Sequence, residues 1–318
     1  MIDKKNLAPV LVLLGPTGVG KTGASVLVAG HLGTEIISAD SMQVYRYMDI
    51  GTAKPAPEQL AAVRHHMIDI VDPWEEFSSG RYIEQVVPII DSLHKEGRIP
   101  LVVGGTGLYI KAMTRGLFEA PGADWPLREE LLLIERESPG SLYERLELLD
   151  PVRADELVPT DSRRIVRALE VCIKSGQPMS GMHEDLTAPL PYDFIKVGLI
   201  RDRTELYRRI EERVDRMIEA GLIDEVRRFL GVNPCRTALQ AIGYKEIAQY
   251  LRSGVDLENA VNNVKIASRR YAKRQITWFR KEEGIRWIDI TGQHDEEEIV
   301  YLIMQRMETE KIATDFGS

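Results

Sequence analysis

The stretch Val10-Leu-Val-Leu-Leu14, followed at once by Gly15-Pro-Thr-Gly-Val-Gly-Lys21-Thr22, decides the fold of this chain. The unbroken apolar run predicts a strand buried on both faces of a parallel sheet. The glycines, Lys21 and Thr22 have the spacing of a Walker A phosphate loop that opens a helix at Lys21. In such a loop, backbone N–H groups surround a di- or triphosphate, the lysine adds a positive charge, and the threonine hydroxyl faces Mg²⁺. We therefore predict that a phosphorylated ligand with Mg²⁺ is bound by Gly15, Pro16, Thr17, Gly18, Val19, Gly20, Lys21 and Thr22.

The rest of the chain alternates between strands and helices and then becomes purely helical. After the helix Lys21–His31, we expect strands at Glu35–Ala39, Met67–Ile70 and Leu101–Val103, with a helix over Gly80–Glu96. Residues 118–192 show only helical patterns punctuated by prolines, before a strand signal returns at Phe194–Ile200. We predict an α/β fold: a P-loop NTPase-like parallel sheet core formed by residues 1–117 and 193–318, with an all-helical insertion domain at residues 118–192.

The composition limits the classes of partner and the cellular compartment that we expect for this protein. The 318 residues carry a net charge of −8, which argues weakly against a nucleic-acid partner, although local clusters of positive charge override the sum. Two cysteines are too few for a disulfide framework and fit a reducing compartment. The N-terminal residues are polar, and the apolar run after them is too short to span a membrane. We expect a cytoplasmic protein with no membrane contact, and a monomer because no assembly motif is visible.

Asp40 directly follows the predicted strand Glu35–Ala39, and ligands of open α/β sheets lie beyond the carboxyl ends of the strands. Its carboxylate is expected in the site, either as a general base or in the second shell of the metal, and the sequence leaves both open. His65-His66 on an extended segment point to opposite faces, so we do not expect them to share a metal. The strand Leu101–Val103, where a Walker B acid is usual, runs instead into Gly104-Gly-Thr-Gly107. A nucleotide hydrolase without that acid would be unusual.

The segment Val264–Lys281 combines positive charge with aromatic side chains. It holds seven Lys or Arg residues and no acidic residue, interleaved with Tyr271, Trp278 and Phe279. A helix face that is merely solvated normally mixes both signs, so a stretch of one sign in an acidic protein favours an RNA contact surface. A second candidate surface is the helix that Asp161 is able to cap, which carries Arg163, Arg164 and Arg167.

Taken together, these residues resemble one enzyme family, the bacterial tRNA dimethylallyltransferases, also called tRNA isopentenyltransferases. The resemblance covers the chain from about Val10 to Phe279. The blocks that carry it, in the family's order, are Gly15–Thr22, Asp40-Ser-Met-Gln-Val-Tyr45, Asp49-Ile-Gly-Thr-Ala-Lys54, His65-His-Met-Ile-Asp-Ile70, Gly104-Gly-Thr-Gly-Leu-Tyr109, Arg164-Ile-Val-Arg-Ala-Leu-Glu170, Gly243-Tyr-Lys-Glu246 and Lys273-Arg-Gln-Ile-Thr-Trp-Phe-Arg280.

Members of this family transfer a five-carbon prenyl group from dimethylallyl diphosphate to the exocyclic amine of the adenine just 3′ of the anticodon in tRNA. The resemblance implies that the phosphate loop, Lys21 and Mg²⁺ hold the diphosphate leaving group, so that no hydrolytic acid is needed. It implies that Asp40 accepts the proton of the amine, that Thr106 contacts the substrate and the diphosphate, and that Arg128 contacts the diphosphate. The partner would be the anticodon stem-loop, contacted by Asp40, Ser41, Met42, Gln43, Thr106, Arg163, Arg164, Arg167, Gln240, Gly243, Lys245, Lys273, Arg274 and Arg280.

Three other functions are compatible with some of the same motifs. A P-loop nucleotide kinase would share the loop and Asp40 but would not need the basic segment. An adenylate isopentenyltransferase would prenylate a free nucleotide and should lack a tRNA-binding surface such as Arg269–Lys281. A nucleotide-gated RNA-binding switch would bind ATP or GTP tightly without transferring a group.

Overall fold

The computed structural model describes residues 7–116, 121–185, 188–254 and 256–308. The chain forms two compact units: the first contains Met1–Ile110 and Pro191–Ser318, and the second contains Lys111–Leu190. Helix α4 (Gly107–Arg115) spans the boundary. Within the described part of the chain, no helix is both long and apolar enough to cross a membrane.

The first unit is built on a six-stranded parallel sheet with the order β3-β2-β4-β1-β5-β6. Its strands are β1 (Pro9–Leu14), β2 (Ile36–Ala39), β3 (His65–His66), β4 (Leu101–Gly104), β5 (Asp193–Ile200) and β6 (Ile285–Asp289). The predicted α/β class with a parallel sheet is confirmed. The apolar run of β1 is central and has no exposure to solvent, as expected for a strand covered on both faces.

The strand register brings the functional loops to one edge of the sheet. Leu14, the last residue of β1, pairs with Gly104, the last residue of β4, and Gly104 also pairs with Ala39 at the end of β2. A Cβ on Gly104 would lie 2.2 Å from the carbonyl oxygen of Ala39, so only glycine allows this approach. The segments after β1, β2 and β4 therefore leave the sheet side by side.

The third strand differs from its prediction. The strand expected at Met67–Ile70 is a turn, and the paired residues are His65 and His66 just before it. Met67 (φ 64°) and Asp69 (φ 56°) adopt left-handed backbone conformations that interrupt an extended strand. Met67 is buried, whereas Ile68 and Ile70 are only partly buried, and the segment does not extend the sheet.

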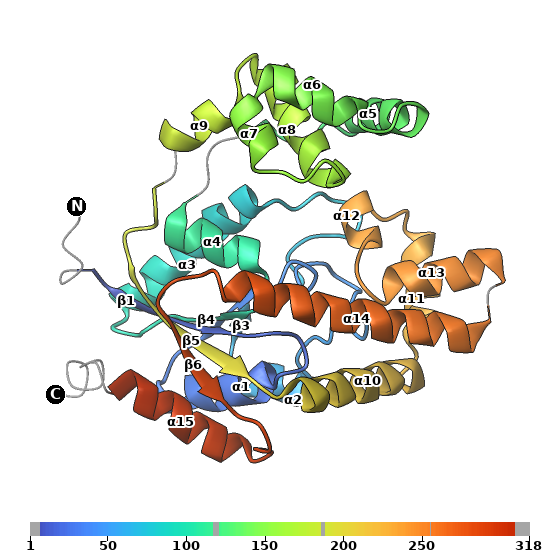
Figure 1. Cartoon of the computed structure of the whole chain (residues 1–318). Helices are drawn as coiled ribbons and strands as arrows, with labels where there is room; N and C mark the ends of the chain where they lie inside the picture. Colours follow the sequence, from blue (N-terminus) through green and yellow to red (C-terminus); the bar gives the residue numbers. More distant parts are fainter. Residues whose placement is uncertain (1–6, 117–120, 186–187, 255, 309–318) are drawn as a thin grey trace. The chain divides into compact units, whose positions relative to one another are not determined.

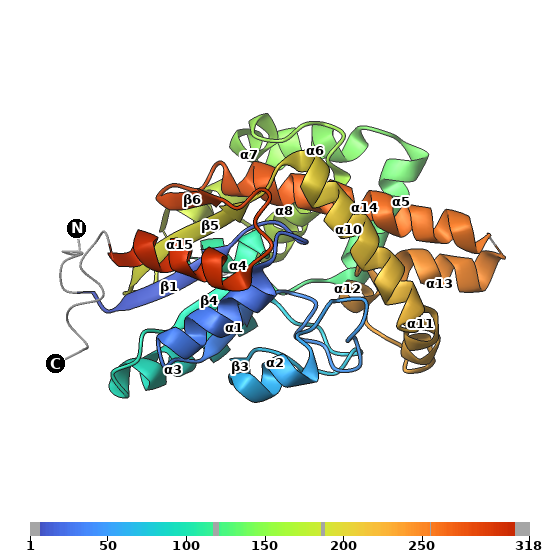
Figure 2. The same cartoon turned by 90° about the horizontal axis from the view of Figure 1, so that it is seen from below.

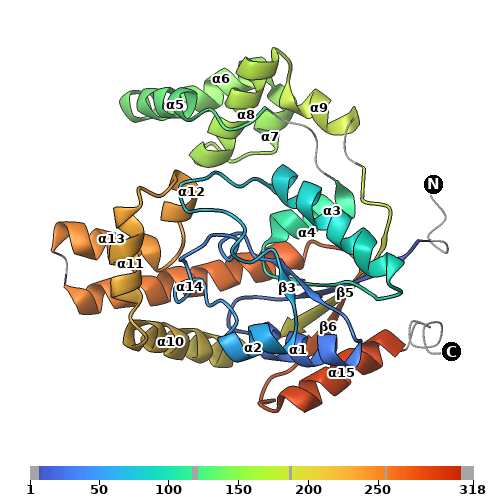
Figure 3. The same ribbon diagram turned by 180° about the vertical axis from the view of Figure 1, so that it is seen from behind.

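Helices cover both faces of the sheet in the first unit. Figures 1 and 3 show α1 (Lys21–His31) and α15 (Glu296–Glu308) on one face and α3 (Ser79–Lys95) on the other. Figure 2 shows α10 (Arg203–Glu219) alongside α14 (Leu257–Phe279), and these two helices are in contact. The remaining helices of this unit are α2 (Pro57–Ala62), α11 (Leu222–Gly231), α12 (Arg236–Leu239) and α13 (Tyr244–Ser253).

The described residues of the second unit form no strands; after the end of α4 they contain the helices α5 (Trp125–Glu137), α6 (Ser141–Leu149), α7 (Pro151–Asp155), α8 (Ser162–Ser175) and α9 (Met179–Asp185). It has its own apolar core, to which Leu131, Leu146 and Leu169 belong. Asp161 caps α8 by accepting a hydrogen bond from the backbone N–H of Arg164 (3.3 Å), which confirms the predicted cap.

Candidate active site

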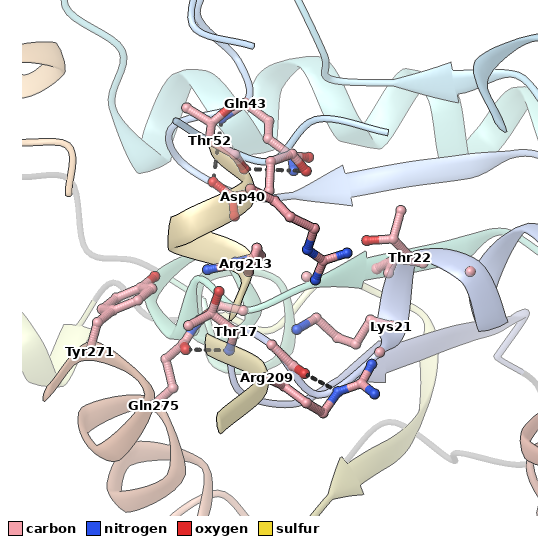
Figure 4. Close-up of a pocket in the computed structure, with 18 of the residues that line it drawn as sticks. Thr17, Lys21, Thr22, Asp40, Gln43, Thr52, Arg209, Arg213, Tyr271 and Gln275 are labelled. Atoms are coloured by element: carbon pink, nitrogen blue, oxygen red, sulfur yellow. Dashed lines mark hydrogen bonds between the residues drawn. The ribbon is translucent and has the colours of Figure 1, made fainter. Parts of the chain in front are cut away.

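A pocket of about 810 Å³ lies in the first unit, where β1, β2 and β4 end. Its walls come from the phosphate loop, from the segments after β2 and β4, and from helices α10 and α14. Asp40 and Gln43 lie on one side of this pocket, with Lys21 and Arg209 on the other (Figure 4). The residues that line it include Thr17, Lys21, Thr22, Ser38, Asp40, Gln43, Thr52, Ala53, Gly105, Arg209, Arg213, Arg216, Tyr271 and Gln275.

Lys21, the first residue of α1, is held inside the phosphate loop. Its Nζ donates hydrogen bonds to the carbonyl oxygens of Gly15 (2.8 Å) and Pro16 (2.9 Å). Burial lowers the pKa of Lys21 from 10.5 to about 8, and the nearby charge of Asp40 opposes this shift. A buried ammonium group gains most from an anionic ligand, because the ligand offsets the loss of hydration.

Gln275 of α14 ties the phosphate loop to the loop after β4, and it was not predicted. Its Oε1 accepts a hydrogen bond from the backbone N–H of Thr17 (2.8 Å), and its Nε2 donates one to the carbonyl of Gly105 (2.8 Å). The N–H of Thr17, predicted to face a phosphate, is therefore engaged by Gln275. The available signal was the inward-facing pair Tyr271 and Gln275, spaced by one helical turn within the basic segment.

Asp40 uses only one of its carboxylate oxygens to hold the chain. Its Oδ1 accepts hydrogen bonds from the backbone N–H groups of Met42 (2.8 Å) and Gln43 (3.3 Å) and so closes the turn after β2. Among the described residues Oδ2 accepts no hydrogen bond, and the side chain lines the pocket. This arrangement leaves one oxygen for a proton or for the water shell of a metal.

Thr106 and Ser41 meet directly after the end of β2. The Oγ1 of Thr106 accepts a hydrogen bond from the backbone N–H of Ser41 (3.0 Å), and the N–H of Thr106 bonds to the carbonyl of Ala39 (3.1 Å). Tyr271 of α14 is half-buried, and this burial raises the pKa of its phenol. Of Thr106, Ser41 and Tyr271, Tyr271 lines the pocket, and its raised pKa keeps the phenol protonated.

Gln43 is fixed by its own hydrogen bonds. Its Nε2 donates to the carbonyls of Thr52 (3.4 Å) and Ala53 (3.2 Å), and its Oε1 accepts from the hydroxyl of Ser38 (3.0 Å). Gln43, Thr52 and Ala53 together form one wall of the pocket. Met42, the remaining predicted residue of this segment, contributes the N–H that Asp40 accepts.

Three arginines of α10 line the pocket and were also missed by prediction: Arg209, Arg213 and Arg216. The Nε of Arg209 donates to the carbonyl of Gly18 (3.1 Å) in the phosphate loop. The Nε of Arg213 is buried and has no hydrogen-bond partner within the described structure. Burial lowers the pKa of Arg213, and Asp40 opposes this shift. Their spacing along the helix was the signal, since it places all three arginines on one face.

Thr22 follows the lysine and exposes its side chain at the pocket. The described residues contain no group of three or more His, Cys, Asp or Glu side chains placed to hold a metal ion. Mg²⁺ typically binds through one or two protein oxygens, substrate phosphates and water. The hydroxyl of Thr22, with Asp40 across the pocket, fits that mode. His66 instead hydrogen-bonds to Glu35 (2.5 Å).

The predicted RNA-contact residues of α14 lie on its exposed side. Lys273, Arg274 and Arg280 are exposed, and none of them forms an ion pair with a described residue. The guanidinium of Arg274 lies 5.6 Å from the ring centre of Tyr271, which lines the pocket. The basic surface thus adjoins the pocket wall.

Other cations of the basic segment are neutralised by α10. Lys265 pairs with Asp215 (2.6 Å), and Arg269 pairs with Glu211. Trp278 is half-buried and Phe279 fully buried, so the aromatic residues anchor the helix.

The block that contains Gln240, Gly243 and Lys245 is placed at the start of α13. Gln240 and Lys245 are exposed, whereas Gly243 is buried with φ 92° and caps the helix. Its N–H donates to the carboxylate of Glu246 (2.9 Å). Gly243 is therefore required by the backbone conformation at the helix start.

In the second unit, two predicted site arginines converge on the buried Glu170. The Nε and Nη2 of Arg128 donate to the two oxygens of this carboxylate (2.8 Å each), and Arg167 donates to it as well. Burial alone raises the pKa of Glu170, but these hydrogen bonds lower it overall. Arg163 and Arg164 are exposed, and Arg164 pairs with Asp161 (3.5 Å).

Comparison with known proteins identifies the family. A family model described as IPP transferase matches residues 43–282. A tRNA dimethylallyltransferase of Thermodesulfovibrio yellowstonii is 56% identical over 294 residues, which cover 90% of this chain and 93% of that protein. One from Thermotoga maritima is 44% identical over 284 residues, with 89% and 92% covered.

Solved structures agree with this family assignment and with the resemblance noted from the sequence motifs. The full-length tRNA isopentenylpyrophosphate transferase of Bacillus halodurans is 40% identical, with a TM-score of 0.67, and the match covers 95% of this chain and 97% of that chain. A eukaryotic dimethylallyltransferase acting on tRNA is 28% identical, with a TM-score of 0.78 and coverage of 97% and 81%. The chain therefore belongs to the IPP transferase family, the family of the tRNA dimethylallyltransferases.

Proposed function

We propose that this protein transfers the dimethylallyl group of dimethylallyl diphosphate to the exocyclic amine of the adenosine 3′-adjacent to the anticodon of tRNA, with release of diphosphate. The observation that carries the proposal is that one pocket contains both a site for a diphosphate and a carboxylate that is able to accept a proton. The phosphate loop with Lys21 lies on one side, and the partly free carboxylate of Asp40 lies on the other. The family relationship supports the choice of donor and acceptor.

The diphosphate of the donor is assigned to the loop residues, with Lys21 and the pocket arginines as its cations. Arg213 is well suited to this role because its buried Nε has no partner among the described residues. Mg²⁺, held at Thr22 when bound, supplies further positive charge for the departing diphosphate. Arg128 is proposed as an additional diphosphate contact on the basis of the resemblance.

The transfer needs one proton acceptor and one stabilised leaving group. The amine nitrogen of the adenine forms a bond to the first carbon of the dimethylallyl group while the bond from that carbon to the diphosphate oxygen breaks. Asp40 takes the proton that the amine loses, and Lys21 stabilises the negative charge on the departing oxygen. Thr106 and Ser41 are proposed to contact the reacting groups.

The adenine reaches this pocket only if it leaves the stack of the anticodon loop, as in other base-modifying enzymes. Exposed cations are proposed to bind the RNA backbone, and uncharged residues of the family motifs are proposed to contact the RNA beside them. The proposed contacts are Met42, Gln43, Arg163, Arg164, Arg167, Gln240, Gly243, Lys245, Lys273, Arg274 and Arg280.

Incubation of the purified protein with unmodified tRNA, Mg²⁺ and labelled dimethylallyl diphosphate tests the proposal. Label should appear in tRNA, and nuclease digestion with mass spectrometry should place it on the adenosine next to the anticodon. ATP should be turned over negligibly. Robust ATP hydrolysis or phosphoryl transfer without labelled tRNA, or labelling of free adenylate in place of tRNA, would overturn the assignment.

A further inference from the structure

Glu225 of α11 is a buried carboxylate that the proposed reaction does not use. It is 4% exposed and accepts hydrogen bonds from three consecutive backbone N–H groups, those of Asp49 (3.1 Å), Ile50 (2.8 Å) and Gly51 (3.0 Å). The hydroxyl of Tyr244 donates a fourth hydrogen bond to it. Consecutive N–H groups that converge on one carboxylate form an anion-binding nest, with the anion here supplied by a distant helix.

The segment held in this way is conformationally demanding. Five non-glycine residues of the described chain have positive φ, and four of them lie between Tyr47 and Asp69. One of these is Ala53 (φ 51°), two residues beyond the nest. Such conformations persist only where the surroundings over-determine them, and they cluster at functional sites.

The same segment forms a wall of the pocket. Thr52 and Ala53 line the pocket, and their carbonyls accept the hydrogen bonds of the side-chain amide of Gln43. A continuous path of hydrogen bonds and short backbone links therefore connects Glu225, through residues 49–53, to Gln43.

We propose that Glu225 is a positioning residue for prenyl transfer: it fixes residues 49–53 and thereby the wall formed by Gln43, Thr52 and Ala53, against which the adenine is placed. The inference rests on the proposed function of this pocket. Glu225 itself touches neither substrate. Its loss should reduce the fraction of bound tRNA in which the adenine is correctly placed, while the phosphate contacts that dominate RNA affinity stay intact.

The substitution Glu225→Gln isolates the effect because it preserves shape. The amide nitrogen of glutamine donates hydrogen bonds, so it cannot accept one from the N–H groups of the nest. Two controls are available. Asp224→Asn removes the neighbouring charge, which is exposed and paired with Arg227. Tyr244→Phe removes the fourth hydrogen bond but leaves the three N–H contacts to the loop.

Single-turnover transfer at saturating tRNA and donor is the first measurement. Glu225→Gln should lower the rate on the order of tenfold, the effect of one or two lost charge-assisted hydrogen bonds, with the dissociation constants of tRNA and of magnesium diphosphate changed less than about twofold. Asp224→Asn should stay within about twofold of the wild type, and Tyr244→Phe, which keeps the three N–H contacts, should lose less activity than Glu225→Gln. A wild-type transfer rate in Glu225→Gln would overturn the inference. So would a loss of transfer rate in Asp224→Asn as large as that in Glu225→Gln.

A double-mutant cycle separates positioning from general destabilisation. If Glu225 acts through Gln43, Glu225→Gln should have little further effect in a Gln43→Ala background, whereas independent effects would multiply. Hydrogen exchange should show that the N–H groups of residues 49–51 are accelerated more in Glu225→Gln than the slowest-exchanging N–H groups of the core. Multiplicative losses, or unchanged exchange at these residues, would refute the role. Absence of transfer by the wild-type protein would instead refute the proposed function.

Discussion

The two carboxylate oxygens of the single residue Asp40 have different tasks, one structural and one proposed to be chemical. One carboxylate oxygen closes the turn after β2, and the other lines the pocket without a hydrogen-bond partner among the described residues. A residue that only capped the turn would be replaceable by asparagine, which keeps an acceptor oxygen for the two N–H groups. Substitution by asparagine therefore separates the proposed role of Asp40 as a base from its role in holding the turn.

We predict that Asp40→Asn lowers the rate of prenyl transfer by about 10²- to 10⁴-fold, the usual contribution of a general base. The turn should survive, because asparagine still accepts from Met42 and Gln43, so tRNA affinity should change little. Single-turnover kinetics and a binding titration measure the two quantities. Near-normal transfer by the variant would exclude Asp40 as the base.

The lowered pKa of Lys21 leads us to predict that diphosphate binding depends on pH. Its pKa is about 8 in the free protein and rises when an anion stabilises the ammonium form. Above pH 8 the free protein has lost a proton that the complex keeps, so binding takes up a proton and affinity falls as pH rises, by up to about tenfold per pH unit. Below pH 8 Lys21 is charged in both states, and its contribution to the pH dependence disappears.

Calorimetry with magnesium diphosphate in buffers of different ionisation enthalpy measures this proton uptake. Lys21→Met has no titrating group at this position and reports the protons taken up by the diphosphate alone. Equal proton uptake by the two proteins at pH 9 would show that Lys21 does not titrate on binding.

Helix α14 shows how one element serves two purposes. Its buried face, with Ala272, Gln275 and Phe279, packs against the core and holds the phosphate loop. Its exposed face carries the cations that lack acidic partners among the described residues. Phe279 is fully buried and anchors the helix to the core, but this anchoring does not explain the exposed cations.

We predict that the triple variant Lys273→Ala, Arg274→Ala, Arg280→Ala weakens binding of different tRNAs alike and flattens the salt dependence, because fewer phosphates are neutralised. Magnesium diphosphate should still bind at Lys21. Lys265→Ala is the matched control, since its charge is already neutralised by Asp215. Unchanged affinity and salt slope in the folded triple variant would shift the RNA site to Arg163, Arg164 and Arg167.

At the scale of the whole molecule, the chain forms two compact units with separate cores. In the second unit Glu170 is fully buried and joins Arg128 and Arg167. Removing one partner of such a buried group leaves uncompensated charges, which costs much more than the loss of an exposed pair.

We predict that Glu170→Ala destabilises the second unit by about 3 kcal/mol or more. Limited proteolysis during thermal unfolding should show earlier cleavage within Lys111–Leu190, while the first unit is unaffected. Glu156→Ala, which removes the exposed partner of Arg153, should cost less than about 1 kcal/mol. Equal effects of the two substitutions would mean that Glu170 is not essential to this unit.

The sequence by itself determined the features that depend on residues close together in the chain. The apolar run and the glycine spacing around Lys21 specified strand, loop and helix, and the change of pattern after residue 117 predicted the helical segment. The resemblance supplied the family, which the comparisons confirmed. The roles of individual site residues stay predictions.

Only the tertiary structure decided which distant residues complete the pocket. Gln275 reaches Thr17, and Glu225 reaches residues 49–51, across most of the chain, and neither pairing leaves a local pattern. The misplaced third strand has the same cause, because left-handed residues at Met67 and Asp69 bend a segment whose composition suits an extended strand. Local periodicity reports which face of an element is buried, whereas the partner of each buried polar group is chosen by the packing of elements far apart in sequence.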